Sequence, residues 1–164
     1  MDDHAPKLNF NANRILDAIP HYEPLSKYGN KDYTVSGKHY RIISSAQRYH
    51  ARGIASWYGA RFHGHKTANH ERYNMFAMTA AHKTLPLPTY LRVTNLRNNK
   101  HVVVRVNDRG PFHGKRIIDL SYAAAKKLKL IGHGIARVDI SAITAYAKHQ
   151  PRPQKKHFKH WLDG

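Results

Sequence analysis

Apolar and polar residues alternate most regularly in two neighbouring segments, Tyr90–Thr94 and His101–Val106. A period of two residues predicts β-strands, because successive side chains of a strand point to opposite faces. Asn98 and Asn99 lie between the two segments. Asparagine tolerates left-handed backbone angles, so this pair favours a tight turn. We therefore predict a β-hairpin over this part of the chain.

Other short apolar segments, separated by turn-forming residues, predict a small hairpin and four more strands. The hairpin covers Tyr33–Val35 and His39–Ile43, and the strands cover Ala51–Tyr58, Ala77–Ala81, Arg116–Asp119 and Ile135–Ile140. A helix is predicted over Tyr122–Leu130, because Ser121 can cap its first turn and the following alanines favour helix. A short helical patch is expected around Asn13–Ile19. Many short strands with few helices indicate a mainly β protein, built as a small barrel.

The chain has 164 residues, which suffices for one domain with a core and not for two. We expect a loop-rich N-terminal extension (1–32), a β-hairpin lead-in (33–50), the barrel domain (51–145) and a basic, disordered tail (146–164). No apolar run approaches the roughly 18 residues that a membrane span needs. The first ten residues lack the basic and apolar parts of a signal peptide, so none is expected there.

The charge is strongly unbalanced, with 28 Lys and Arg against 10 Asp and Glu, a formal net charge of +18. Such an excess predicts a polyanionic partner, and nucleic acid, acidic lipid and an anionic cell-wall polymer all qualify. The absence of cysteine excludes disulfides and thiolate metal sites. The 14 histidines are scattered without ligand spacing, so no metal and no cofactor are expected.

The segment Val102–Ser121 carries the densest candidate chemistry. Its apolar strand ends in Asn107, Asp108 and Arg109, and a Gly-Pro turn follows before a second apolar stretch delivers Asp119. Carboxylates at strand ends with a fixed turn between them indicate a site on a rigid scaffold. The alternative is a tight turn held by an Asp–Arg pair. A third carboxylate, Glu71, favours the site, since a polar loop offers it no evident structural purpose.

Four motifs in order resemble the rare lipoprotein A family: GIASWYG (Gly53–Gly59), TANHERYN (Thr67–Asn74), TAAHKTLPLPTYLRVTN (Thr79–Asn95) and VVVRVNDRGPFHGKRIIDLSYAAAKKL (Val102–Leu128). The resemblance covers about Gly53 to Ile140. It implies a six-stranded double-psi β-barrel with one or two short helices. It also implies a lytic transglycosylase, which cleaves peptidoglycan between N-acetylmuramic acid and N-acetylglucosamine and leaves a 1,6-anhydromuramoyl end.

The resemblance carries the catalytic roles onto Glu71, His82, Asp108 and Asp119. We hypothesise that Glu71 or Asp119 is the acid/base, with a pKa raised by burial or by a neighbouring carboxylate. Asp108 would tune that pKa or stabilise positive charge in the transition state, and His82 would hydrogen-bond a carboxylate or the substrate. Substrate contacts are expected from six further residues: Trp57, Tyr58, Tyr73, Asn74, Asn107 and Arg109.

Each of these residues has a purely structural alternative. Asp119 could bond the first turn of the following helix, His82 could be a satisfied buried histidine, and the aromatic residues could be core. Two positions depart from the family pattern: His70 replaces a glycine and Asn74 replaces a carboxylate. His70 would therefore occupy a left-handed backbone conformation that favours glycine.

The partners follow from the same resemblance: peptidoglycan glycan strands and the cell-division machinery, with the protein itself a monomer. It implies a periplasmic protein whose precursor is an outer-membrane lipoprotein, with membrane contact only through a lipid-bearing Cys that has no counterpart in this sequence. The main alternative is a non-catalytic, expansin-like barrel that grips peptidoglycan without cutting it. A nucleic-acid-binding barrel is not expected, because carboxylates in the best motifs would repel phosphate.

Overall fold

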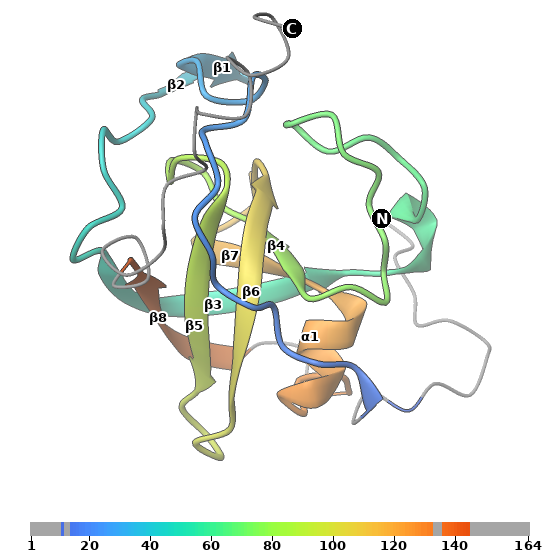
Figure 1. Ribbon diagram of the computed structural model, residues 1–164. Coiled ribbons are helices and arrows are strands. Elements are labelled where there is room, and N and C mark those ends of the chain that lie inside the picture. The colour runs from blue at the N-terminus through green and yellow to red at the C-terminus, as the bar shows by residue number, and fades with distance from the viewer. Residues whose placement is uncertain (1–10, 12–13, 133–135, 145–164) are drawn as a thin grey trace, which may run out of the picture.

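The computed structural model describes residues 11, 14–132 and 136–144, so the expected tail lies outside the described residues. Six strands close into a barrel in the order β3-β7-β4-β6-β5-β8, which confirms the expected six-stranded, mainly β architecture (Figure 1). The strands are β3 (His50–Tyr58), β4 (Thr79–Ala81), β5 (Thr89–Asn95), β6 (His101–Asp108), β7 (Arg116–Ser121) and β8 (Ala136–Ile143). β1 (Tyr33–Val35) and β2 (Lys38–Tyr40) form the predicted separate hairpin.

The barrel contains two parallel strand pairs, β3 with β7 and β4 with β6, and four antiparallel pairs. Alternate side chains of each strand point inward and fill the interior. Leu91, Val104, Ile118 and Ile140 are fully buried there. Burying each such side chain contributes roughly 1.5–3 kcal/mol of transfer free energy, so the barrel wall is a rigid support for loops at its ends.

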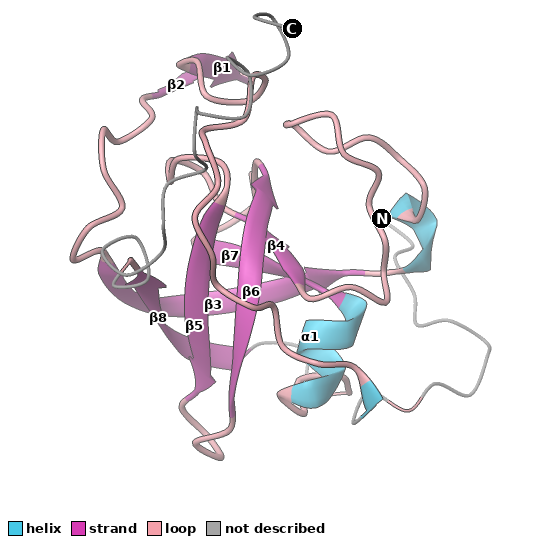
Figure 2. Ribbon diagram, in the orientation of Figure 1, coloured by secondary structure: helices cyan, strands magenta, loops and turns pink. Residues whose placement is uncertain are grey.

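Helix α1 (Tyr122–Lys127) packs on the barrel directly after β7 (Figure 2). The Ser121 hydroxyl accepts a hydrogen bond from the Ala124 amide, as the sequence predicted. The buried residues of its first turns include three consecutive alanines, whose small side chains allow close approach to the barrel. The helix ends at Lys127, shorter than predicted, and Lys129 takes a left-handed φ of 61°. A 3₁₀ turn, Ala60–Phe62, follows β3. No helix in the described part of the chain could span a membrane.

Residues 14–30, called the strap below, run along the outside of β5 and β6 (Figure 1). The Ala18 amide donates to the Val103 carbonyl at 3.0 Å, and the Ser26 amide donates to the Leu87 carbonyl at 2.8 Å. The helical patch expected around Asn13–Ile19 is found only at its start, since Arg14 lies in a 3₁₀ turn whereas residues 16–20 are irregular. The described part of the N-terminal extension, from residue 14 onward, therefore packs on the barrel.

Side chains of the strap repeat every three residues. Large apolar side chains are exposed at Leu16, Ile19, Tyr22, Leu25 and Tyr28. The positions that follow each of them face the barrel or are partly covered by it: Asp17, Pro20, Glu23, Ser26 and Gly29. A period of three is that of an extended, polyproline-like ribbon rather than a helix.

Candidate functional site

A groove of about 850 Å³ opens beside the end of β6. Aromatic side chains, carboxylates and cations line it together. The lining residues are Ala55, Ser56, Trp57, Tyr58, Phe62, His65, Lys66, Tyr73, Ala81, Asp108, Arg109, Gly110, Pro111, Phe112, His113, Arg116 and Asp119. Such a mixture suits a carbohydrate that carries negative charge, because sugar faces pack on aromatic rings and cations attract carboxylates.

Two of the predicted carboxylates flank a small residue in this groove. Ala81 on β4 pairs with Asp119 on β7 and, on its other side, with Asp108 on β6. Neighbouring strands lie about 4.8 Å apart, so the two aspartate Cα atoms are about 10 Å apart across the alanine. A β-bulge shifts the β4–β6 register between Ala80 and Ala81 and skips Asn107. The bulge places Asp108, rather than Asn107, opposite Ala81.

Asp108 is held by backbone amides. Its Oδ1 accepts hydrogen bonds from the amides of Ala68 and Arg109, both at 2.8 Å. Burial raises the pKa of Asp108 above its ordinary value, although these two bonds and the Arg109 charge oppose the rise. A carboxyl whose pKa is raised and that lines a groove is a candidate general acid.

Asp119 lies on β7, and the Ser56 hydroxyl donates to its Oδ1 at 3.2 Å. The structural alternative for Asp119 was a bond to the first turn of the helix. Ser121 occupies that capping role instead. Asp119 therefore lies in the groove wall, where it can contact a bound chain.

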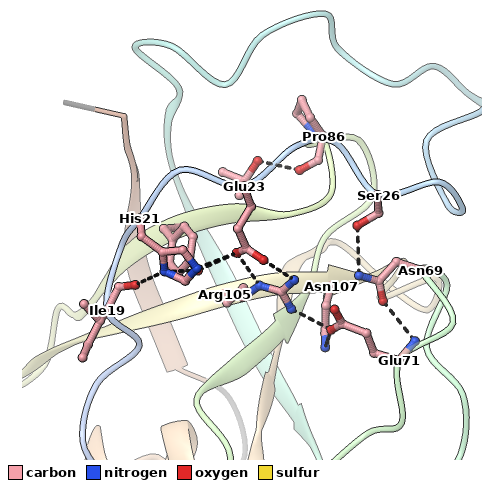
Figure 3. A network of polar contacts seen from close by, with 11 residues as sticks. Ile19, His21, Glu23, Ser26, Asn69, Glu71, Pro86, Arg105 and Asn107 are labelled. Atoms are coloured by element: carbon pink, nitrogen blue, oxygen red, sulfur yellow. Dashed lines mark hydrogen bonds and ion pairs between the residues drawn. The ribbon is translucent and has the colours of Figure 1, made fainter. Parts of the chain in front are cut away.

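Glu71 has different neighbours from those expected (Figure 3). Its Oε1 accepts hydrogen bonds from Arg105 Nη1 at 2.6 Å and from Asn107 Nδ2 at 2.9 Å. Burial alone would raise the pKa of Glu71, but the bonds from Arg105 and Asn107 outweigh it and lower the pKa. The expected rise is wrong because a guanidinium and an amide, rather than Asp108 or Asp119, surround the carboxylate. Glu71 also lies outside the groove lining.

His82 is buried behind the groove wall and does not line it. Its Nδ1 accepts from the amides of Thr84 and Leu85, both at 3.1 Å. The proton is therefore on Nε2, which donates to the Tyr49 hydroxyl at 2.8 Å. Burial, with help from Arg109 and Lys83, lowers the pKa of His82 to about 3, so the ring stays neutral at physiological pH. In this geometry His82 shapes the turn after β4.

The Arg109 guanidinium points toward backbone carbonyls. It donates to Gly29 O at 2.9 and 3.0 Å, to His82 O at 3.2 Å and to Leu85 O at 2.5 Å. These bonds join the strap, the turn after β4 and the end of β6. The sequence placed Arg109 among substrate-binding residues. It does line the groove, but its charged end is engaged within the protein.

Three predicted aromatic residues line the groove and also belong to the core. The Tyr73 hydroxyl donates to Tyr58 O at 3.0 Å and accepts from the Tyr122 amide at 3.2 Å. The Trp57 ring packs against Tyr122, with ring centroids 5.7 Å apart. The two readings proposed from sequence, core and sugar platform, are thus compatible for these residues.

Residues 50–140 match the family model described as "Lytic transglycolase". The chain belongs to the RlpA-like family of double-psi β-barrels. It is 56% identical to the endolytic peptidoglycan transglycosylase RlpA of Vibrio cholerae over 94% of this chain and 59% of that protein. The proteins of the same name from Pseudomonas aeruginosa and Neisseria meningitidis are each 55% identical, over 86% and 77% of this chain. The chain spans 41% and 53% of their lengths.

The two departures from the RlpA-like pattern have structural explanations. His70 adopts a φ of 68°, the left-handed conformation predicted from the glycine that it replaces. Its ring stacks on Tyr28 of the strap, with centroids 3.7 Å apart, which offsets part of the backbone cost. Asn74 Oδ1 accepts from the Phe76 amide at 3.0 Å, so Asn74 forms a turn and does not line the groove.

Sequence reasoning missed several residues that the structure brings to this RlpA-like site. Arg105 occupies an outward-facing position in the alternation of β6, where its charge was a signal for a polar partner on the outer face. Phe112 is 37% exposed at the groove, next to the Gly-Pro turn that the sequence did single out. Glu23 gave no signal, because nothing in the sequence relates the strap to β6.

Proposed function

We propose that the protein is a peptidoglycan lytic transglycosylase, which cleaves the bond between N-acetylmuramic acid and N-acetylglucosamine without water. The observation that carries this proposal is the groove in which Asp108 and Asp119 flank Ala81 within an RlpA-like barrel. The relatives' printed activity supports the same reaction class and an endolytic mode, which cuts within strands.

One carboxyl can serve both steps of this reaction. It first donates its proton to the glycosidic oxygen that leaves with N-acetylglucosamine. The muramoyl C6 oxygen then bonds to C1, and the C6 hydroxyl proton passes to the same carboxylate, so no water is consumed. The raised pKa of Asp108 supports this residue as the acid/base. Asp119 is then placed to stabilise positive charge that develops at C1.

Glu71 has a supporting role in this proposal rather than the acid role weighed from sequence. Its lowered pKa favours the ionised form, and an ionised carboxylate cannot donate a proton. Its bonds to Arg105 and Asn107 hold the loop that also supplies the Ala68 amide to Asp108. Loss of Glu71 would therefore displace this loop and, with it, the Ala68 amide that binds the Asp108 carboxylate.

Part of the basic charge of the chain lies at the groove. Lys66, Arg109 and Arg116 line it, and the muramoyl lactyl group or stem peptide brings carboxylates to the substrate. We expect the dissociation constant for peptide-free glycan strands to rise about tenfold between low and high salt, since salt screens exposed charges. Arg116→Gln should reduce this salt dependence, whereas Lys100→Gln, at the far end of the β5–β6 hairpin, should preserve it. Binding that ignores salt would contradict an electrostatic groove.

Mass spectrometry of digested peptidoglycan and peptide-free glycan strands tests the proposed reaction. The expected products end in 1,6-anhydromuramic acid, and internal cleavage shortens strands throughout the length distribution. Reducing ends would instead indicate a hydrolase. Binding without cleavage would move the protein to the expansin-like alternative.

Location and partners are proposals of the same kind. A periplasmic site of action follows from the proposed substrate. Association with the division machinery and a monomeric state are likewise inferred from the family resemblance.

A further inference from the structure

Arg105 on β6 bonds both to the strap and to the loop that carries Glu71. The chain contains two glutamates, Glu23 and Glu71, and both bind Arg105 (Figure 3). We propose that Glu23 is a positioning residue, which orients the Arg105 guanidinium so that this group holds Glu71 and its loop at the groove. This inference deepens the proposed function and rests on it for its effect on turnover.

The guanidinium geometry supports this assignment. Arg105 Nε donates to Glu23 Oε2 at 2.8 Å, and Nη2 donates to Glu23 Oε1 at 2.9 Å. This two-point contact fixes the plane of the guanidinium. Nη1, the remaining nitrogen, then points to Glu71 Oε1 at 2.6 Å. A plane fixed by Glu23 therefore determines where the third donor lies.

Glu23 is itself anchored on the barrel. The Tyr90 hydroxyl donates to Glu23 Oε2 at 2.6 Å, and His21 lies 3.8 Å from the same oxygen. Tyr90 on β5 is paired in register with Arg105 on β6, so both side chains point outward beneath the strap. The Glu23 and Arg105 side chains are only 22% and 21% exposed. Tyr90 and the strap thus position the Glu23 carboxylate independently of Arg105.

A chain of hydrogen bonds links Arg105, through Glu71 and its loop, to Asp108 in the groove. Glu71 belongs to the loop of Lys66–Tyr73, in which the Thr67 amide donates to the Glu71 carbonyl at 2.7 Å. The next residue, Ala68, donates its amide to Asp108 in the groove. A second strap contact, from the Asn69 side chain to the Ser26 hydroxyl at 3.2 Å, fixes the same loop. Orientation of Arg105 is thereby linked to the position of a groove carboxylate.

The titration of Glu71 in the full chain tests this proposal without relying on activity. Glutamate labelled with ¹³C at the side-chain carboxyl yields two signals in the native protein and a single signal, that of Glu71, in Glu23→Gln. Removal of a nearby negative charge alone would lower the pKa of Glu71. Loss of Arg105 orientation instead frees Glu71 from its strongest partner and raises the pKa. A rise supports the proposal, and a fall or no change overturns it.

Two further variants sharpen the result. Asp17→Asn removes the other strap carboxylate, which binds Lys127 at 3.3 Å, far from Glu71, and should leave the Glu71 signal unchanged. Arg105→Lys retains the charge but loses the two-point contact, so it should shift Glu71 in the same direction as Glu23→Gln. A shift in Asp17→Asn equal to that in Glu23→Gln would overturn a specific role for Glu23.

Turnover provides the second readout. In Glu23→Gln we expect kcat on glycan strands to fall about tenfold with KM within twofold, because a displaced site group affects the chemical step more than binding. If the native chain forms no anhydro product, the proposed function fails while the Glu71 titration still decides the role of Glu23. An unchanged kcat in an active enzyme would overturn the effect of Glu23 on turnover, even if the Glu71 pKa rises.

Discussion

Replacement of Asp108 by asparagine is expected to lower the rate of 1,6-anhydro product formation by about 10²- to 10⁴-fold, the usual contribution of general acid–base catalysis. Asparagine has the same shape and can accept the amide bonds of Ala68 and Arg109, but it cannot transfer a proton. The rate is measured by quantifying anhydro ends released from glycan strands. Asp139→Asn, on the ion-paired surface formed with Arg52 and His50, is the matched control and should retain the native rate.

The same substitution should not destabilise the fold. The pKa of Asp108 is raised in the folded state, so the stability that its protonated form contributes is present at low pH and is lost as pH rises through that pKa. Ionisation of the buried Asp108 at neutral pH lowers the stability of the folded state, and asparagine does not ionise. We therefore expect Asp108→Asn to be at least as stable as the native protein at neutral pH in denaturant unfolding. A large loss of stability would attribute the lost activity to misfolding.

Glu71→Gln and Asp119→Asn distinguish the roles of the three carboxylates. Native turnover in Asp108→Asn, with loss in Asp119→Asn alone, would transfer the acid role to Asp119. Native turnover in all three variants would contradict catalysis by these residues.

Replacement of Arg109 by alanine is expected to lower the free energy of unfolding by about 3 kcal/mol. Several buried carbonyl groups lose a charged donor, and each unsatisfied group costs about 1 kcal/mol or more. Gly29, His82 and Leu85 supply those carbonyls. For a chain of this size the midpoint of thermal unfolding should fall by about 6–12 °C.

Arg92→Ala, an exposed arginine on β5, is the control for the loss of one positive charge. Its effect should stay within about 0.5 kcal/mol, as is usual for exposed substitutions. An equal effect of the two substitutions would show that Arg109 contributes through net charge rather than through its carbonyl bonds. Native stability of Arg109→Ala would show that the strap remains attached by its other contacts.

The barrel could be predicted from the sequence because its strands and turns have recognisable local sequence patterns. Alternation marked β5 and β6, the Asn98–Asn99 turn was found with Asn99 at a φ of 59°, and Ser121 was identified as the helix cap. These features depend on residues close together in the chain. The positive φ of His70 was predicted differently, from the glycine that the family motif has at this position.

The site was harder to predict, because the protonation of its carboxyl groups depends on contacts between segments far apart in the sequence. Glu71 meets Arg105 across 34 residues and Arg105 meets Glu23 across 82, so the direction of the Glu71 pKa could not follow from its own loop. The register shift that turns Asp108 toward Ala81 is likewise a property of strand pairing. Motifs identified the carboxylates, and only the fold determines which of them faces the groove.

The contacts of the strap determine which residues a functional fragment of this protein must include. The family match starts at residue 50, but Glu23 and Gly29 lie well before it and anchor Arg105 and Arg109. A fragment that begins at residue 50 would keep every barrel strand but lose Glu23, a partner of Arg105, and Gly29, a partner of Arg109. The family model's boundary therefore encloses the barrel and leaves out the strap, so truncation series on this protein should extend upstream of Asp17.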